Sequence, residues 1–206
     1  MITQIKTLWH SLEPGPKDKF PEVVYVIVEV PKDSKEKYEL DKKSGALFLD
    51  RDLFGSMVFP GDYGSIPQTL CEDGDPIDAL ILVSQPHYPG VVIPVRPIGL
   101  IKMEDEKGRD EKVLCVPDDK IDPSFKEVRD LKDVPEHRLL EIENFFEYYK
   151  YLEPGKWVKI EEWQDREGAY KYIGEAVKLY KRKFKKRSKN QKRSKNQKRS
   201  KNKNYL

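Results

Sequence analysis

The densest cluster of polar side chains in the chain is the segment Glu72-Asp73-Gly74-Asp75-Pro76-Ile77-Asp78. In a regular strand Asp73 and Asp75 would lie on one face, and Asp78 would point to the other. Gly74 can adopt backbone dihedrals that are closed to other residues, and Pro76 fixes its own φ and favours an extended conformation at the residue before it. A bend at these two residues would let all three carboxylates converge.

Converging carboxylates repel one another, so they are stable together only when they are protonated or when cations lie between them. Carboxylate oxygen is the hard ligand that Mg²⁺, Mn²⁺ and Ca²⁺ prefer. The spacing does not fit an EF-hand, because the twelfth position counted from Asp73 is Ser84 rather than Glu. From these residues alone two interpretations stay open, a divalent-metal site and a hydrated acidic turn.

A second acidic segment spans residues 104–112 and contains Glu104, Asp105, Glu106, Asp110 and Glu111. It lies between two apolar runs, which is typical of a charged hairpin tip. Composition alone favours a solvated tip, but its position would also let it fold over the first cluster and add carboxylates to it.

The charge of the chain is divided unevenly along its length. The formal net charge is +3, yet all 36 acidic residues lie at or before Glu175, and the residues after it include 15 Lys and Arg and no acid. The body is therefore acidic, which argues against nucleic-acid binding by the body because phosphate backbones require a basic surface. An acidic body suits a protein that collects cations.

Short apolar and β-branched runs separated by Gly and Pro predict a mainly β fold with peripheral helices (α+β). The predicted strands are residues 23–30, 38–40, 46–50, 57–59, 79–83, 91–95, 98–103, 112–116 and 157–163. Strands this short and closely spaced favour a barrel or sandwich over βαβ units. Apolar residues at three- and four-residue spacing predict a helix that begins near Pro135 and is stopped by Glu153-Pro154-Gly155, and a second helix is expected over residues 165–180.

We expect one domain over residues 1–180 and a basic low-complexity tail over residues 181–206. From Lys186 the unit Lys-Arg-Ser-Lys-Asn-Gln occurs twice and begins a third time, with no apolar residue before Tyr205. Such a segment cannot bury enough surface to offset its ordering entropy, so we expect it to be disordered. A solvated extension is the simplest interpretation, and contact with polyanions is the alternative.

Targeting signals are not evident in the sequence. No apolar run approaches the roughly 18–20 residues that span a bilayer, and the N-terminal residues lack the features of a signal peptide. We therefore expect a cytoplasmic protein without a membrane partner. Cys71 and Cys115 form no motif and are expected to be reduced thiols.

Taken together, these segments resemble the family I (soluble) inorganic pyrophosphatases of prokaryotic type. The resemblance covers about residues 14–180, and the matching stretches follow the family order at near-family spacing. They are Lys37-Tyr38-Glu39, Gly45-Ala46-Leu47-Phe48-Leu49-Asp50-Arg51, Asp62-Tyr63-Gly64, Asp73-Gly74-Asp75-Pro76-Ile77-Asp78, Val95-Arg96-Pro97-Ile98-Gly99, Lys102-Met103 through Lys112, Phe145-Phe146-Glu147 and Tyr149-Lys150.

The resemblance implies an OB-like five-stranded β-barrel that hydrolyses inorganic pyrophosphate to two orthophosphates. It implies several Mg²⁺ ions per site, with Mn²⁺ or Zn²⁺ as possible substitutes, and a homohexamer. It also implies a role for each matching residue. The implied metal ligands are Asp73, Asp78, Asp105 and Asp110, and the implied general base is Asp75. The implied substrate contacts are Lys37, Arg51, Tyr63, Lys112, Tyr149 and Lys150, and the supporting acids are Glu29 and Glu39.

These implied roles suit the chemistry of pyrophosphate hydrolysis, in which charge neutralisation and positioning carry catalysis. Two metals sharing a water would lower its pKa from about 15.7 toward 7, and a carboxylate at Asp75 could accept its proton. From the residues alone, however, Tyr149 would be a core residue, and Lys150 would complement a helix dipole.

Two positions depart from the family pattern, which often has Tyr where this chain has Phe59 and usually has Asn where it has Asp62. Asp62 would add negative charge beside the site, but neither change touches an implied ligand. Two other functions stay open: an OB-type nucleic-acid module with a basic tail, and an inactive homologue that only binds metals or partners.

Overall fold

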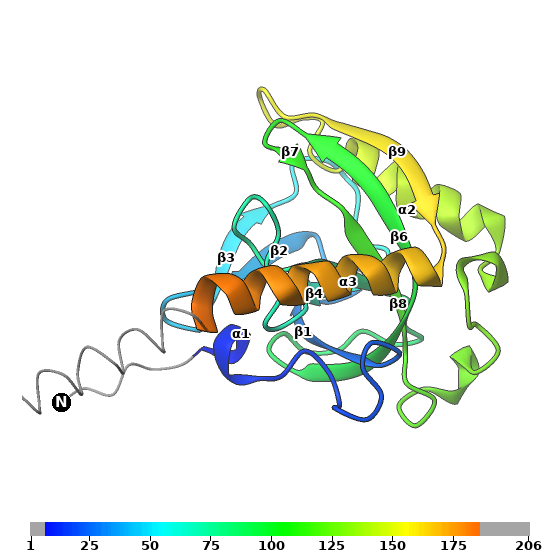
Figure 1. Ribbon diagram of the computed structural model, residues 1–206. Coiled ribbons are helices and arrows are strands. Elements are labelled where there is room, and N and C mark those ends of the chain that lie inside the picture. The colour runs from blue at the N-terminus through cyan, green and yellow to red at the C-terminus, as the bar shows by residue number, and fades with distance from the viewer. Residues whose placement is uncertain (1–6, 186–206) are drawn as a thin grey trace, which may run out of the picture.

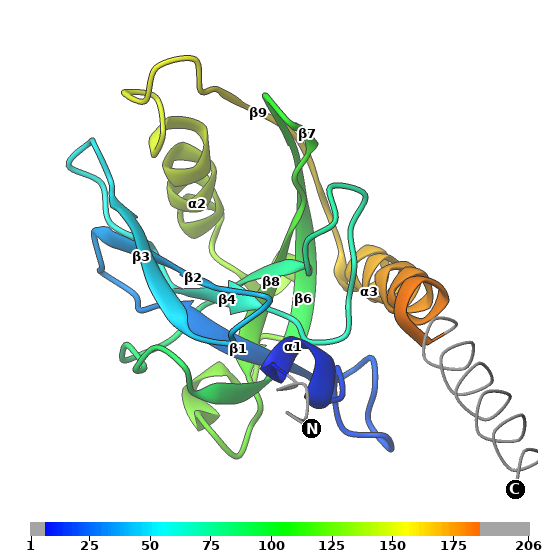
Figure 2. The same ribbon diagram turned by 90° about the vertical axis from the view of Figure 1, so that its left-hand side faces the viewer.

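The computed structural model describes residues 7–185, and in it five strands form a closed ring (Figures 1 and 2). The ring strands are β1 (Val24–Val30), β4 (Asp62–Ser65), β5 (Asp78–Ile81), β8 (Lys112–Pro117) and β6 (Val92–Asp105). Each pairs with the next, and β6 pairs back onto β1 to close the ring. All of these pairs are antiparallel except β5–β8, which is parallel. The five-stranded OB-like barrel that the family resemblance implied is thus confirmed.

The remaining strands extend or flank this ring. β2 (Glu36–Leu40) and β3 (Leu47–Asp52) form a separate two-stranded hairpin, whose turn ends at Gly45 with a positive φ of 75°. The short β7 (Gly108–Arg109) and β9 (Val158–Gln164) both pair with β6. β6 is therefore the strand that links the ring to its outer extensions.

The helices cover the ring from outside. α2 (Glu136–Tyr148) packs against β9, and α3 (Arg166–Tyr180) runs along β6 (Figure 1). A short α1 (Leu8–Ser11) and two 3₁₀ turns (Pro123–Phe125 and Leu131–Asp133) complete the fold. Both predicted helices are present, and Asp165 caps α3 by accepting a hydrogen bond from the Gly168 N–H, which satisfies one of its free N–H groups. None of the helices within residues 7–185 is long and apolar enough to cross a membrane.

Alternating residues of the ring strands build two hydrophobic clusters. On β5, Ala79 and Ile81 belong to the cluster that contains residues of α3, whereas Leu80, together with Leu82 just after the strand, belongs to the cluster that contains residues of α2. β8 divides its side chains in the same way. This alternation follows from the two-residue period of a strand, and it explains why the ring strands are almost continuously apolar in sequence.

The strand predictions need correction at three places. Residues 57–59 are not a strand; Phe59 lies in a loop, buried against Tyr63 and Phe145. β4 was not predicted, because Asp, Gly and Ser are poor strand formers and only its neighbours hold it extended. Residues 91–95 and 98–103 form the single strand β6, since a register shift between Pro97 and Gly99 absorbs the proline without ending the pairing with β8.

The start of the predicted tail is ordered. Lys181–Lys185 continue α3 as a further helical turn, and the ring of Phe184 packs against Trp9 and Tyr180. Residues 186–206, which contain the repeats predicted to be disordered, lie outside the described part of the chain.

Candidate active site

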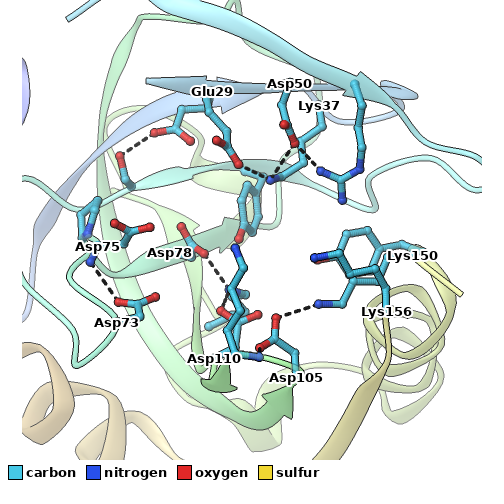
Figure 3. A pocket seen from close by; sticks show the side chains of 18 of the residues that line it. Glu29, Lys37, Asp50, Asp73, Asp75, Asp78, Asp105, Asp110, Lys150 and Lys156 are labelled. Carbon is cyan, nitrogen blue, oxygen red and sulfur yellow. Dashed lines mark hydrogen bonds and ion pairs between the residues drawn. The ribbon is translucent and has the colours of Figure 1, made fainter. Parts of the chain in front are cut away.

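A pocket of about 480 Å³ opens between the ring, the β2–β3 hairpin and the segment that follows α2 (Figure 3). All thirteen side chains that the sequence proposed as site residues line it. They are Glu29, Lys37, Glu39, Arg51, Tyr63, Asp73, Asp75, Asp78, Asp105, Asp110, Lys112, Tyr149 and Lys150. The fold therefore gathers side chains that are separated by more than a hundred residues in the chain.

The first acidic segment forms a tight loop before β5. Cys71 and Asp75 close it through a backbone hydrogen bond of 2.7 Å, and Gly74 turns the chain with a φ of 97°. The carboxylate of Asp73 accepts a 2.9 Å hydrogen bond from the Asp75 N–H. This is the bend expected at Gly74, and it places Asp73 and Asp75 beside Asp78 at the pocket wall (Figure 3). Burial and the neighbouring Asp78 raise the pKa of Asp73.

Lys112 lies between carboxylates of both acidic segments. Its Nζ donates a 2.6 Å hydrogen bond to Asp78 and another to Asp110, and the side chain is almost fully buried. Burial disfavours the ammonium, but the facing Asp78 carboxylate outweighs that cost and raises the pKa of Lys112 well above its usual value. Burial likewise opposes ionisation of Asp78, yet Lys112 brings the pKa of Asp78 below its ordinary value. The same Nζ lies 6.0 Å from the centre of the buried Tyr63 ring.

Glu29 is a buried carboxyl in an otherwise apolar strand. Ser65, on the neighbouring β4, donates a 2.7 Å hydrogen bond to it. Burial, followed by repulsion from Asp78, raises the pKa of Glu29 to about 8. Ser65 was not found from the sequence, because its contact with Glu29 depends on the pairing of β4 with β1, and β4 was not predicted.

The hairpin supplies cations to one side of the pocket. Lys37 on β2 pairs with Glu39 and, at 3.3 Å, with Asp50, while its pairing partner on β3 is Arg51. Although burial opposes the charge, Glu39 raises the pKa of Lys37. Arg51 contacts Asp50 and donates a 2.7 Å hydrogen bond from Nε to Glu153.

A second pair of cations follows α2. Lys150 donates hydrogen bonds to Asp105 at 2.7 Å and to Glu106 at 3.1 Å, and Lys156 donates one to Glu106 at 2.5 Å. Lys150 lies just after the end of α2, and its ammonium points into the pocket toward the second acidic segment (Figure 3). Tyr149 lines the pocket as well and stacks on Phe145 with ring centres 5.2 Å apart, so it belongs to the pocket wall and to the core edge together.

The sequence missed ten further residues that line the pocket. These are Leu40, Lys42, Asp50, Ser65, Pro76, Glu106, Lys107, Arg109, Glu153 and Lys156. Charge density gave a signal for Glu106, Lys107 and Arg109, which belong to the second acidic segment. The partnership of Glu153 with Arg51 had none, because 102 residues separate them.

The two departures from the family pattern lie outside the pocket lining. The Asp62 carboxylate is fully buried; it accepts a 2.8 Å hydrogen bond from the Lys32 N–H and lies 2.7 Å from Nδ1 of His87. Asp62 thus lies beside the site, next to the lining residue Tyr63, and its side chain is hydrogen-bonded outside the pocket. Phe59 is core, as described above.

The donor set suits divalent cations. Its oxygens are carboxylates, the hard ligands that Mg²⁺ and Mn²⁺ favour, and a buried ammonium already bridges Asp78 and Asp110. A positive charge is thus already bound at the place where Asp78 of the first acidic segment and Asp110 of the second lie close to each other. Within residues 7–185 no three His, Cys, Asp or Glu side chains are clustered closely enough to form a complete ligand group by themselves.

A closed five-stranded ring whose pocket sets carboxylates against lysines, arginine and tyrosines defines a barrel protein with a strongly charged pocket, which offers carboxylates to cations and basic groups to anions. The family model described as inorganic pyrophosphatase matches residues 26–181, and the chain belongs to that family.

Individual relatives agree with this assignment. The chain is 45% identical over 174 residues to an inorganic pyrophosphatase of Aquifex pyrophilus, and the match covers 84% of this chain and 97% of the relative. It is 52% identical over 167 residues to one of Gluconobacter oxydans, covering 81% and 95%. The crystal structure of inorganic pyrophosphatase from Thermus thermophilus is similar with a TM-score of 0.80 and 47% identity, covering 87% of this chain and 99% of that one.

Proposed function

We propose that this protein hydrolyses inorganic pyrophosphate to two orthophosphates in a Mg²⁺-dependent reaction. The observation that carries the proposal is the pocket itself, in which the proposed ligands Asp73, Asp78 and Asp110 lie with the cationic Lys112 at one wall, and Lys37 and Arg51 lie at another. Membership of the inorganic pyrophosphatase family supports the same activity.

Divalent cations would be held by Asp73, Asp78, Asp105 and Asp110, with Mn²⁺ or Zn²⁺ as substitutes for Mg²⁺. Bound there, they would neutralise phosphate charge and make a water more acidic. Glu29 and Glu39 would support this set, Glu29 through its contact with Ser65 and its closeness to Asp78, and Glu39 by holding Lys37.

Asp75 is proposed as the general base. It lies at the loop tip, its side chain is half exposed, and its closest charged partner is Lys42, on a long flexible stem, rather than another proposed ligand. An accessible carboxylate beside a metal-binding group can accept the proton of an attacking water, which typically contributes about 10²–10⁴-fold to rate.

The cations and phenols of the pocket would hold the substrate. Lys37, Arg51, Lys112 and Lys150 would offset charge on the two phosphoryl groups, and Arg51 could do so through two parallel hydrogen bonds. Burial raises the pKa of both Tyr63 and Tyr149, so their hydroxyls stay protonated and can donate to phosphate oxygens.

Phosphate release from pyrophosphate tests the proposal. The full chain should release phosphate with Mg²⁺ and lose this activity with a chelator, and Asp75→Asn should abolish most of it. Glu161→Gln, at an exposed position of β9, serves as the matched control and should behave as wild type. No release by the wild-type protein at saturating Mg²⁺ would refute the enzyme and favour an inactive homologue or a binding module.

Three further properties are part of the proposal. We infer a homohexamer, which is supported by exposed apolar side chains such as Phe48, Leu49, Phe54 and Tyr88, and which analytical ultracentrifugation would test.

We place the protein in the cytoplasm, and fractionation of the source cells would test that. We also propose that the basic C-terminal segment contacts polyanions; shortening the chain to end at Lys185 should abolish salt-sensitive retention of RNA while turnover stays unchanged.

A further inference from the structure

The hydroxyl of Tyr172 on α3 contacts Cys71, the residue before the first acidic segment, and Glu111 in the second acidic segment. It lies 3.3 Å from Sγ of Cys71 and donates a 3.2 Å hydrogen bond to the carboxylate of Glu111. A phenol has one hydrogen, so with that hydrogen on Glu111 the Tyr172 oxygen accepts from the Cys71 thiol. The result is a three-residue chain from thiol to phenol to carboxylate.

Cys71 is the base of the first acidic loop. Its N–H donates to the Asp75 carbonyl at 2.7 Å, and its carbonyl accepts from the Gly74 N–H at 3.2 Å. These two bonds close the loop that carries Asp73 and Asp75. A side chain that holds Cys71 therefore holds the position of the whole loop.

Glu111 is the residue through which Tyr172 contacts the second acidic segment. It stands between Asp110 and Lys112, the two residues whose side chains meet beside Asp78. The Asp110 N–H is itself bonded to the Met103 carbonyl on β6. A contact at Glu111 consequently fixes the edge of the pocket that faces the first loop.

α3 is a firm support for this bridge. The ring of Tyr172 packs on the same hydrophobic cluster as Cys71, Ala169 and Ile173, and the Ala176 carbonyl accepts a hydrogen bond from the Leu70 N–H. The helix is thus joined to the chain immediately before the loop by backbone as well as by side chain. Figure 2 shows it lying along the outside of the ring.

We propose that Tyr172 is a positioning residue that sets the separation between the loop at Asp73 and the segment at Asp110, and so sets the affinity of the pocket for divalent cations. This inference rests on the proposed function, because it assumes that those carboxylates bind metal. Tyr172 does not line the pocket, so it acts through the segments it joins.

Calorimetric titration of the substrate-free protein with Mg²⁺ tests the inference directly. Tyr172→Phe keeps the packed ring and removes only the hydroxyl, and it should weaken Mg²⁺ binding by about threefold to tenfold, the worth of one or two hydrogen bonds. The Mg²⁺ concentration for half-maximal activity should rise by the same factor, and most of the lost activity should return as Mg²⁺ is raised.

The matched control is Tyr170→Phe. Tyr170 is on the same helix, but its ring lies beside Arg166 at 5.9 Å. This variant should bind Mg²⁺ as wild type does. Equal Mg²⁺ affinity of Tyr172→Phe and Tyr170→Phe would overturn the inference while leaving the proposed function intact.

A double-mutant cycle supplies an independent readout. Cys71→Ala should weaken Mg²⁺ binding in the wild-type background and should have almost no further effect in the Tyr172→Phe background, because both remove the same chain of contacts. Fully additive losses would overturn the bridge. A wild-type protein that binds no Mg²⁺ would instead refute the proposed function together with this inference.

Discussion

Lys112 and Asp78 face each other across the parallel pair β5–β8, with the Lys112 Nζ 2.6 Å from the Asp78 carboxylate. The pairing register places the two residues side by side although 34 positions separate them in the chain. This contact joins the first acidic segment to the second, because Lys112 also donates to Asp110. One buried ammonium thus holds the two carboxylate groups of the pocket together.

Lys112→Met should destabilise the metal-free protein strongly. The methionine keeps most of the apolar stem but leaves Asp78 and Asp110 without their counter-charge, and removing one partner of a buried pair costs about 3 kcal/mol or more. Urea unfolding in a chelating buffer measures the loss. Lys102→Met is the matched control, since the exposed Lys102–Glu162 pair joins two strands in the same way and should cost under about 1 kcal/mol. Equal losses of unfolding free energy in the two variants would show that the buried pair stabilises the protein no more than the exposed pair does.

The variants Asp75→Asn and Asp110→Asn should have different effects, because Asp75 is proposed as the general base and Asp110 as a metal ligand. Asp75→Asn should lower the rate of phosphate release by about a hundredfold or more, with Mg²⁺ affinity close to wild type, since a base acts on the water. Asp110→Asn should weaken Mg²⁺ binding and activity together. Phosphate assays combined with calorimetric Mg²⁺ titration make the distinction. Equal loss of Mg²⁺ affinity in both variants would make Asp75 a ligand.

The stability of the metal-free protein should fall with rising pH because of Glu29. Burial and then repulsion from Asp78 raise its pKa to about 8 from an ordinary value of 4.5. A carboxyl whose pKa is raised by folding contributes its full stabilisation below its unfolded pKa. That contribution is lost as the pH rises toward 8, because the unfolded chain then releases a proton that the folded chain still holds.

Glu29→Gln removes this titration and isolates it. The difference in unfolding free energy between wild type and Glu29→Gln should fall by a few kcal/mol between pH 4.5 and 8, at about 1.4 kcal/mol per pH unit, measured by urea unfolding with chelator present. Glu161→Gln, an exposed change on β9, controls for the loss of a carboxylate. A constant difference over this pH range would place the Glu29 pKa near its ordinary value.

Gly64→Ala should prevent normal folding. A Cβ at Gly64 would lie 1.9 Å from the Ile27 carbonyl oxygen across the β1–β4 pair, and backbone there cannot give way. We expect a loss of about 3 kcal/mol or more, or insoluble protein. Gly174→Ala is the control, because a Cβ there meets open space on α3 and should stabilise the protein by about 1 kcal/mol. Thermal unfolding of both compares them, and a folded Gly64→Ala protein of wild-type stability would contradict the close approach.

Local features of the chain were predictable. The apolar runs of β5 and β8, the amphipathic pattern of α2, and the turn at Gly74 depend on residues close in sequence, and each appears in the structure. The family resemblance also indicated thirteen of the side chains that line the pocket and missed ten others. The strand β4 was not predictable in this way, because Asp62-Tyr63-Gly64-Ser65 is extended only through pairing with β1 and β5.

By itself, the sequence determined the residue types that the chemistry requires, their order and the turns that carry them, since these follow from local dihedral limits and side-chain periodicity. Only the tertiary structure decided which carboxylate meets which cation: Lys112 with Asp78, Lys150 with Asp105, and Arg51 with Glu153 across 102 residues. It likewise placed the buried Asp62 carboxylate against the Lys32 backbone N–H and the His87 ring, outside the pocket lining. Such partners are chosen by strand register and helix packing, which depend on contacts that are distant in the chain.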